Sequence, residues 1–98
     1  MLKEINDKEF EEVIKTGKVL VDCFANWCGP CKMLSPVIDE LSNEKKDYSF
    51  YKLDVDKSSD VVMKYNVMSI PTLLVFNDGK LVNTIVGLRS KSELENEL

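Results

Sequence analysis

The sequence contains no histidine, and only three of its 98 residues are cysteine. A structural zinc site takes four ligands, mostly from cysteine and histidine side chains. Cys28 and Cys31 form one close pair and Cys23 lies apart from them, so such a site would need a second chain. We therefore expect no bound metal. An odd number of cysteines also differs from the even disulfide framework that is typical of small secreted domains.

No apolar run approaches the length of about 18 residues that a membrane-spanning helix requires. Residues 1–5 carry no apolar core of a signal peptide, so we expect a cytoplasmic protein. Seventeen acidic and thirteen basic residues give a net charge of −4. This balance disfavours nucleic acid or an anionic membrane as the main partner.

Glycine is scarce, with four residues, and no Gly-x-Gly-x-x-Gly pattern is present. That pattern binds the phosphates of dinucleotides, and its domain would not fit into a chain of this length. We therefore expect no bound cofactor. A chain of 98 residues that is 44% hydrophobic is expected to form one domain around one core, and we assign residues 1–98 to it.

The hydrophobic pattern predicts elements in the order βαβαβαββα. Strands are expected at residues 2–5, 19–25, 49–55, 72–76 and 81–86. Four helices are expected. The first begins at Asn6, the second follows the Cys-x-x-Cys, the third begins at Ser58 or Ser59, and the fourth begins at Ser90. The Asp78-Gly79 pair favours a type I′ hairpin between the last two strands. Right-handed crossovers then give an α/β fold, a central mixed β-sheet flanked by helices on both faces.

The most informative segment is Trp27-Cys28-Gly29-Pro30-Cys31, which follows an apolar strand and opens a helix. Two thiols at this spacing can meet across the first helical turn. The N-terminus of the helix supplies free N–H groups and a partial positive charge. Both stabilise a thiolate at Cys28, and a thiolate is the nucleophile of disulfide exchange. We expect an exposed Cys28 as the nucleophile and a more buried Cys31 as the resolving thiol.

Three neighbouring features refine this interpretation. The spacer Gly29-Pro30 carries no cation that would make the pair a stronger oxidant, and this favours a reductant. Asp22 lies in the apolar strand, where burial raises the pKa of an acid until it can accept the proton of Cys31. The alternative is that Asp22 only marks the end of the strand. Cys23 is expected to be an inert core residue.

Four separated motifs resemble the thioredoxin family. They are Val21-Asp22-Cys23-Phe24-Ala25-Asn26-Trp27-Cys28-Gly29-Pro30-Cys31-Lys32, Tyr51-Lys52-Leu53-Asp54-Val55-Asp56, Ser69-Ile70-Pro71-Thr72, and the stretch from Asn77-Asp78-Gly79 to Gly87. The resemblance covers nearly the whole chain and implies the thioredoxin fold. It also implies a thiol–disulfide oxidoreductase that reduces disulfide-containing client proteins. A flavoenzyme of the thioredoxin reductase type, which draws on NADPH, would restore the dithiol.

The resemblance also implies roles for individual residues. It assigns a proton-carrying role to Asp22 and places Lys52 near it, although such a lysine is more often a solvated strand residue. It implies a cis bond at Ile70–Pro71 that exposes the backbone of Ile70 to an extended client segment. The docking surface is expected to comprise Trp27, Gly29, Pro30, Met68, Ile70, Pro71, Gly87 and Leu88.

Two alternatives stay open at this point. A thioredoxin fold can be a binding module or a subunit whose disulfide chemistry is incidental, although the intact Cys28 and Cys31 argue against this. The pair could also work as an oxidase or isomerase, which the uncharged spacer disfavours. We expect a monomer that meets client proteins and a reductase.

Overall fold

The computed structural model describes residues 2–98, whose elements follow the predicted order βαβαβαββα. They are β1 (Lys3–Ile5), α1 (Asp7–Ile14), β2 (Lys18–Phe24), α2 (Gly29–Glu44), β3 (Tyr48–Asp54), α3 (Ser59–Lys64), β4 (Thr72–Asn77), β5 (Lys80–Val86) and α4 (Lys91–Glu97). The strands form one sheet in the order β1-β3-β2-β4-β5. β1, β3 and β2 are parallel, and β4 pairs antiparallel with both β2 and β5. The predicted mixed α/β sheet is confirmed.

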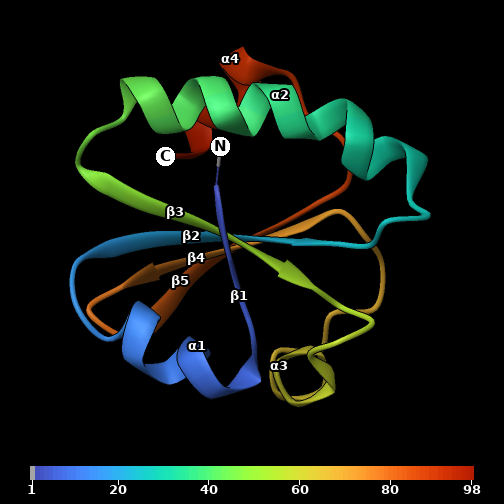
Figure 1. Cartoon of the computed structure of the whole chain (residues 1–98). Coiled ribbons are helices and arrows are strands. Elements are labelled where there is room, and N and C mark those ends of the chain that lie inside the picture. The colour runs from blue at the N-terminus through green and yellow to red at the C-terminus, as the bar shows by residue number, and fades with distance from the viewer. Residues whose placement is uncertain (1) are drawn as a thin grey trace.

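The central strand β2 sends its side chains alternately to the two faces of the sheet. Val21 and Cys23 belong to a core cluster that includes Phe10 of α1 and Val61 of α3. On the other face, β2 contributes Leu20 to a second cluster, which α2 fills with Leu34, Ile38 and Leu41 and α4 with Leu94. Figure 1 shows α1 and α3 on one side of the sheet and α2 and α4 on the other. Asp22 therefore lies on the side covered by α2.

Local sequence signals predict several helix ends and the hairpin correctly. Capping boxes join Asn6 to Glu9 at α1 and Ser90 to Glu93 at α4. At the tip of the β4–β5 hairpin, Asp78 and Gly79 have φ angles of 50° and 86°. Positive φ at both central positions is the geometry of a type I′ turn, so this prediction is confirmed.

The start of α3 departs from its prediction. Ser58 is the N-cap residue, but its side chain makes no capping hydrogen bond. Instead, the carboxylate of Asp7 in α1 accepts the backbone N–H groups of Asp60 and Val61 at 3.1 and 3.0 Å. A carboxylate satisfies the free N–H groups of a helix start and also complements its dipole. This cap comes from a distant part of the chain, so the local pattern around Ser58 could not reveal it.

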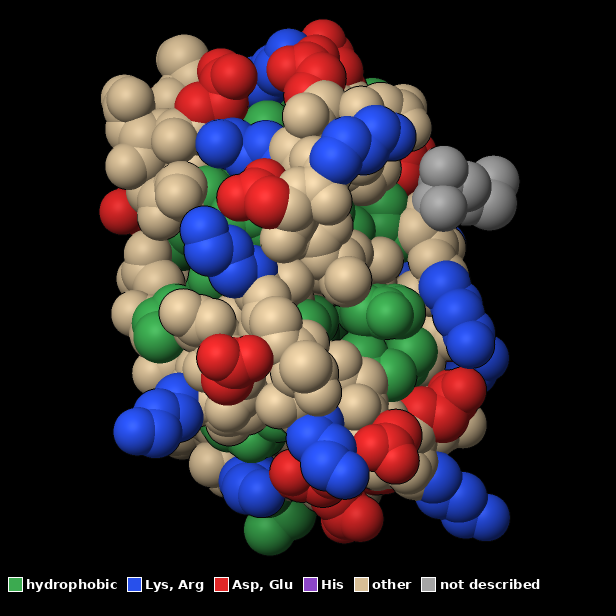
Figure 2. All heavy atoms as spheres, turned by 90° about the vertical axis from the view of Figure 1, so that its left-hand side faces the viewer, with side chains coloured by type: hydrophobic (Ala, Val, Ile, Leu, Met, Phe, Trp, Pro, Cys, Tyr) green, Lys and Arg blue, Asp and Glu red, His purple; other side chains and the backbone are tan. Residues whose placement is uncertain are grey.

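The surface carries both signs of charge. Figure 2 shows Lys and Arg side chains interspersed with Asp and Glu side chains over one face, with apolar side chains between them. Some surface charges pair with each other, as Lys18 of β2 does with Asp47 at 3.4 Å. The face in view therefore offers no continuous basic stripe of the kind that tracks a nucleic-acid backbone. Within residues 2–98, no helix is long and apolar enough to cross a membrane.

Candidate active site

Cys28 and Cys31 lie where β2 leads into α2. Cys28 is the N-cap residue of the helix, and a proline follows within its first turn. The two sulfurs are joined in a disulfide, with the Cα atoms 5.3 Å apart. The backbone N–H of Cys31 points at the sulfur of Cys28, 3.1 Å away. Once the disulfide is reduced, this donor and the helix dipole stabilise negative charge on the Cys28 sulfur.

The burial of Cys28 contradicts the prediction of an exposed nucleophile. Cys28 is 4% exposed and Cys31 is 5% exposed, so Cys28 is not the more open of the two. The reason is packing from a distant segment. Ile70 and Val55 lie against the pair, and the Cys28 sulfur is 3.9 Å from the carbonyl oxygen of Ile70. The loop that carries Ile70 therefore lies against the Cys28 sulfur.

That loop brings the predicted proline and glycine together. The Ile70–Pro71 peptide bond is cis. The backbone N–H of Gly87 donates to the carbonyl oxygen of Pro71 at 2.9 Å, which ties the end of β5 to the loop. Gly87 has a φ of 93°, a backbone conformation that residues other than glycine rarely adopt. Leu88, the next residue, is 45% exposed.

A second set of predicted docking residues flanks the disulfide on the side of α3. Trp27 and Met68 are 70% and 85% exposed, and both line a pocket that Ile70 also borders. The indole N–H of Trp27 donates to the carboxylate of Asp56 at 2.8 Å, which fixes the ring beside Cys28. Nothing in the motif around Asp56 indicates a contact with Trp27, so this role could not be predicted from the sequence.

Asp22 is a buried acid close to the resolving cysteine. It is 6% exposed, and its Oδ1 atom has no hydrogen-bond partner among residues 2–98. Burial raises the pKa of Asp22 to about 7, the charge of Lys52 opposes this shift, and the charge of Asp39 adds to it. Lys52 sits beside Asp22 in the β2–β3 register and holds its ammonium 5.4 Å from the centre of the Phe24 ring. Asp22 does not merely mark the end of a strand, because β2 continues through Phe24.

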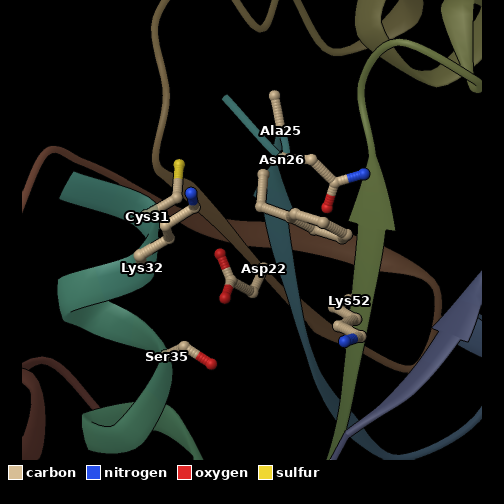
Figure 3. A pocket seen from close by; sticks show the side chains of 8 residues that line it. Asp22, Ala25, Asn26, Cys31, Lys32, Ser35 and Lys52 are labelled. Atoms are coloured by element: carbon tan, nitrogen blue, oxygen red, sulfur yellow. The ribbon is translucent and has the colours of Figure 1, made fainter. Parts of the chain in front are cut away.

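A pocket of about 180 Å³ joins Asp22 to Cys31 (Figure 3). Lys32 and Ser35 of α2 border it on one side, and Lys52 of β3 borders it on the other. The volume suits several water molecules, each of which takes about 30 Å³ in the liquid. Water in this pocket can carry a proton between the Cys31 sulfur and the Asp22 carboxylate. Among residues 2–98, no group of three or more His, Cys, Asp or Glu side chains that could hold a metal ion is found.

Comparison with known proteins agrees with this geometry. The family model described as Thioredoxin matches residues 1–98. The chain belongs to the thioredoxin family. The thioredoxin of Mycoplasmoides gallisepticum is 43% identical over 96 residues, which cover 96% of each chain. That of Listeria monocytogenes is 46% identical over 96 residues, covering 97% of this chain and 93% of the relative.

A solved structure, the oxidized form of mitochondrial thioredoxin 3 from Saccharomyces cerevisiae, matches with a TM-score of 0.91 and 36% identity. The match covers 98% of this chain and 92% of the yeast chain. Family membership and the disulfide between Cys28 and Cys31 are together consistent with a thiol–disulfide oxidoreductase. Membership of the thioredoxin family also implies disulfide substrates and a reductase partner in general.

Cys23 takes no part in this arrangement. Its side chain is fully buried and packs in the core cluster on the α1 side of the sheet, together with Leu53 and Leu74. Burial, with a smaller effect from the charge of Asp22, raises the pKa of Cys23 to about 12. The predicted burial of Cys23 is confirmed. We expect a buried thiol with a raised pKa to be inert in disulfide exchange.

Proposed function

We propose that the protein reduces disulfide bonds in client proteins, with Cys28 as the nucleophile and Cys31 as the resolving thiol. The observation that carries this proposal is the N–H of Cys31 directed at the Cys28 sulfur at the start of α2. That donor favours the Cys28 thiolate, and it serves the nucleophile rather than the resolving thiol. This donor therefore supports different tasks for the two sulfurs, although both are buried.

The reaction proceeds in two exchanges. The Cys28 thiolate attacks one client sulfur, a mixed disulfide forms, and the other client sulfur leaves as a thiolate that takes up a proton. Cys31 gives its proton to Asp22 and attacks the Cys28 sulfur, and the second client sulfur leaves as a thiolate that takes up a proton from solvent. The client gains two electrons and two protons, and the protein is left with the Cys28–Cys31 disulfide.

Client binding and proton transfer involve the residues around this pair. An extended client segment pairs with the backbone of Ile70 as an added strand, and the exposed apolar side chains of Trp27, Met68 and Leu88 border it. Gly29, Pro30, Pro71 and Gly87 complete the docking surface with backbone that stands close to the client. Lys52 stabilises the charged form of Asp22, because its ammonium opposes the rise in the pKa of that acid.

The remaining parts of the cycle rest on the family relationship. A flavoenzyme of the thioredoxin reductase type returns two electrons to the Cys28–Cys31 disulfide. The protein works as a monomer in the cytoplasm, without a cofactor of its own and without nucleic acid or membrane as a partner. The uncharged Gly29-Pro30 spacer keeps the disulfide stable, so the pair acts as a reductant rather than as an oxidase or isomerase.

Limited alkylation of the reduced protein tests the assignment of the nucleophile. Reduced protein is treated with iodoacetamide at pH 7, the labelled cysteine is identified by peptide mapping, and client reduction is measured on the same samples. We expect Cys28 to react at least tenfold faster than Cys31, since only the thiolate reacts and a tenfold difference needs about 1.4 kcal/mol. Client reduction should fall in proportion to the labelling of Cys28.

Two outcomes would contradict the proposal. Preferential labelling of Cys31 would reverse the roles of the two sulfurs. Client binding with no release of client thiols from unlabelled protein would support a binding module instead. The buried Cys23 serves as an internal control, because it should stay unlabelled until the protein is denatured.

A further inference from the structure

A polar stripe runs along α2 below the active-site disulfide. Cys31, Ser35 and Asp39 follow one another at intervals of four residues, and this spacing places them on one face of the helix. Two neighbouring pockets of about 180 and about 110 Å³ lie against this face. Three residues line both pockets: Asp22, Ser35 and Lys52. Cys31 borders only the first pocket, and Asp39 only the second.

Asp22 needs a route for its proton. Its Oδ1 atom is fully buried and finds no hydrogen-bond partner among residues 2–98, and a buried polar atom of this kind is expected to bind water. Figure 3 shows the carboxylate of Asp22 and the hydroxyl of Ser35 extending toward the pocket from the sheet and from α2, respectively. Ser35 is itself exposed to solvent. The serine therefore stands between the buried carboxylate and bulk water.

Ser35 has the chemistry that this position requires. A hydroxyl donates one hydrogen bond and accepts others, so it can orient water in either direction of proton flow. An ammonium such as that of Lys52 can only donate. Among the described residues that line either pocket, Ser35 alone bears a hydroxyl.

The other groups that face Asp22 do not duplicate this role. β4 contributes an apolar residue, Leu73, directly opposite Asp22 in the sheet. The charged groups on the facing elements are Lys52 of β3, Glu4 of β1 in register with Lys52, and Lys32 and Asp39 of α2. These groups shift the charge balance of the acid, whereas the neutral Ser35 can organise water without adding charge.

We propose that Ser35 is a positioning residue whose hydroxyl holds a chain of water molecules between the Asp22 carboxylate, Cys31 and solvent. The proposal rests on the proton-accepting role proposed for Asp22. The Cys31 proton passes to the Asp22 carboxylate as the Cys28–Cys31 bond forms and the bond from Cys28 to the client breaks. The proton then leaves Asp22 through this water to solvent, and the departing client thiolate takes up a proton from solvent.

The pair Ser35→Thr and Ser35→Val tests the hydroxyl itself. Threonine and valine have the same shape and the same β-branched cost in a helix, but only threonine keeps a hydroxyl. The rate is measured at pH 7 for a single turnover of the reduced protein with a disulfide-containing client. We expect Ser35→Val to be about fivefold slower than Ser35→Thr. This effect is smaller than the rate acceleration of about 10²- to 10⁴-fold that a general acid or base contributes, because Ser35 only positions water for Asp22. Ser35→Thr should stay within about twofold of the parent.

The same pair is then measured in an Asp22→Asn background. A purely structural role of Ser35 would give the same ratio of rates in both backgrounds. We expect the difference between threonine and valine to vanish there, because the acid that Ser35 serves is gone. Ser49→Ala, an exposed serine of β3 that lines neither pocket, should react like the parent.

Equal rates for Ser35→Thr and Ser35→Val in the Asp22 protein would overturn the proposal. So would an equal ratio in both backgrounds, since Ser35 would then act apart from Asp22. A parental rate for Asp22→Asn alone would refute the proposed role of Asp22, and that result is read without any Ser35 variant. If a β-branched variant fails to fold, Ser35→Ala replaces the pair, and a parental rate for it overturns the proposal.

Discussion

Replacing Cys31 with serine is expected to stop turnover at the mixed disulfide and to leave the protein covalently attached to its client. The Cys28 thiolate can still attack, because the helix start and the backbone N–H of residue 31 are unchanged by the substitution. The second exchange needs a thiol at position 31, which serine does not supply. Steady-state reduction should therefore fall by at least 10³-fold, as expected when a covalent step is removed.

A non-reducing gel measures this trap directly. Cys31→Ser should give a band at the combined mass of protein and client, and the band should disappear when dithiothreitol is added. Cys28→Ser is the matched control, with the same chemical change three residues away, and it should give no such band. Trapping by Cys28→Ser but not by Cys31→Ser would show that the roles are reversed.

The Asp22→Asn variant is expected to be more stable than the parent at alkaline pH and slower in disulfide reduction near pH 7. The folded protein holds the pKa of Asp22 at about 7, compared with 3.8 for the exposed side chain. Folded Asp22 therefore keeps its proton to higher pH than unfolded Asp22 does, and the free energy of unfolding decreases as the pH rises from about 4 to about 7. Above that range the parent carries the full cost of a buried charge, on the order of 4 kcal/mol.

Denaturant unfolding of both proteins at several pH values tests this linkage. The stability difference should be small at pH 4, grow through pH 7 and level off near pH 8, because asparagine has no charge to bury. Asp47→Asn is a suitable control, since this exposed acid pairs with Lys18 at the surface. It should change stability by less than about 1 kcal/mol at any pH. A pH-independent difference for Asp22→Asn would show that Asp22 does not titrate near 7.

Features that depend on neighbouring residues could be predicted from the sequence. The alternation of β2, the capping boxes of α1 and α4 and the Asp78-Gly79 turn all involve short stretches of chain, and each predicted strand lies within one residue of its observed bounds. The Cys-x-x-Cys at the end of a strand likewise defined the redox pair. Asp22 could be identified because a lone carboxylate inside an apolar strand conflicts with the pattern around it.

Features that depend on contacts between distant segments could not be predicted in the same way. The cap that Asp7 provides for α3 and the hydrogen bond from Trp27 to Asp56 both join parts of the chain that are remote in sequence. The burial of Cys28 has the same origin, since Ile70 packs against it with its carbonyl oxygen 3.9 Å from the sulfur. Ser35 looks like an ordinary exposed helix residue until the sheet places Asp22 opposite it. In the proposed mechanism, the loop around Ile70 and the pocket beside Ser35 determine how the nucleophile is reached and how protons move.

A reducing role is tested best by the reduction potential of the Cys28–Cys31 couple, measured by equilibrium with glutathione buffers and quantified by alkylation of free thiols. A client reductant must be oxidised more readily than glutathione, so we expect the pair to be mainly disulfide even where most of the glutathione is reduced. This follows from the uncharged Gly29-Pro30 spacer and the absence of any histidine in the chain. A pair that stays dithiol in buffers rich in oxidised glutathione would be an oxidant, and this result would contradict the proposed reduction of client disulfides.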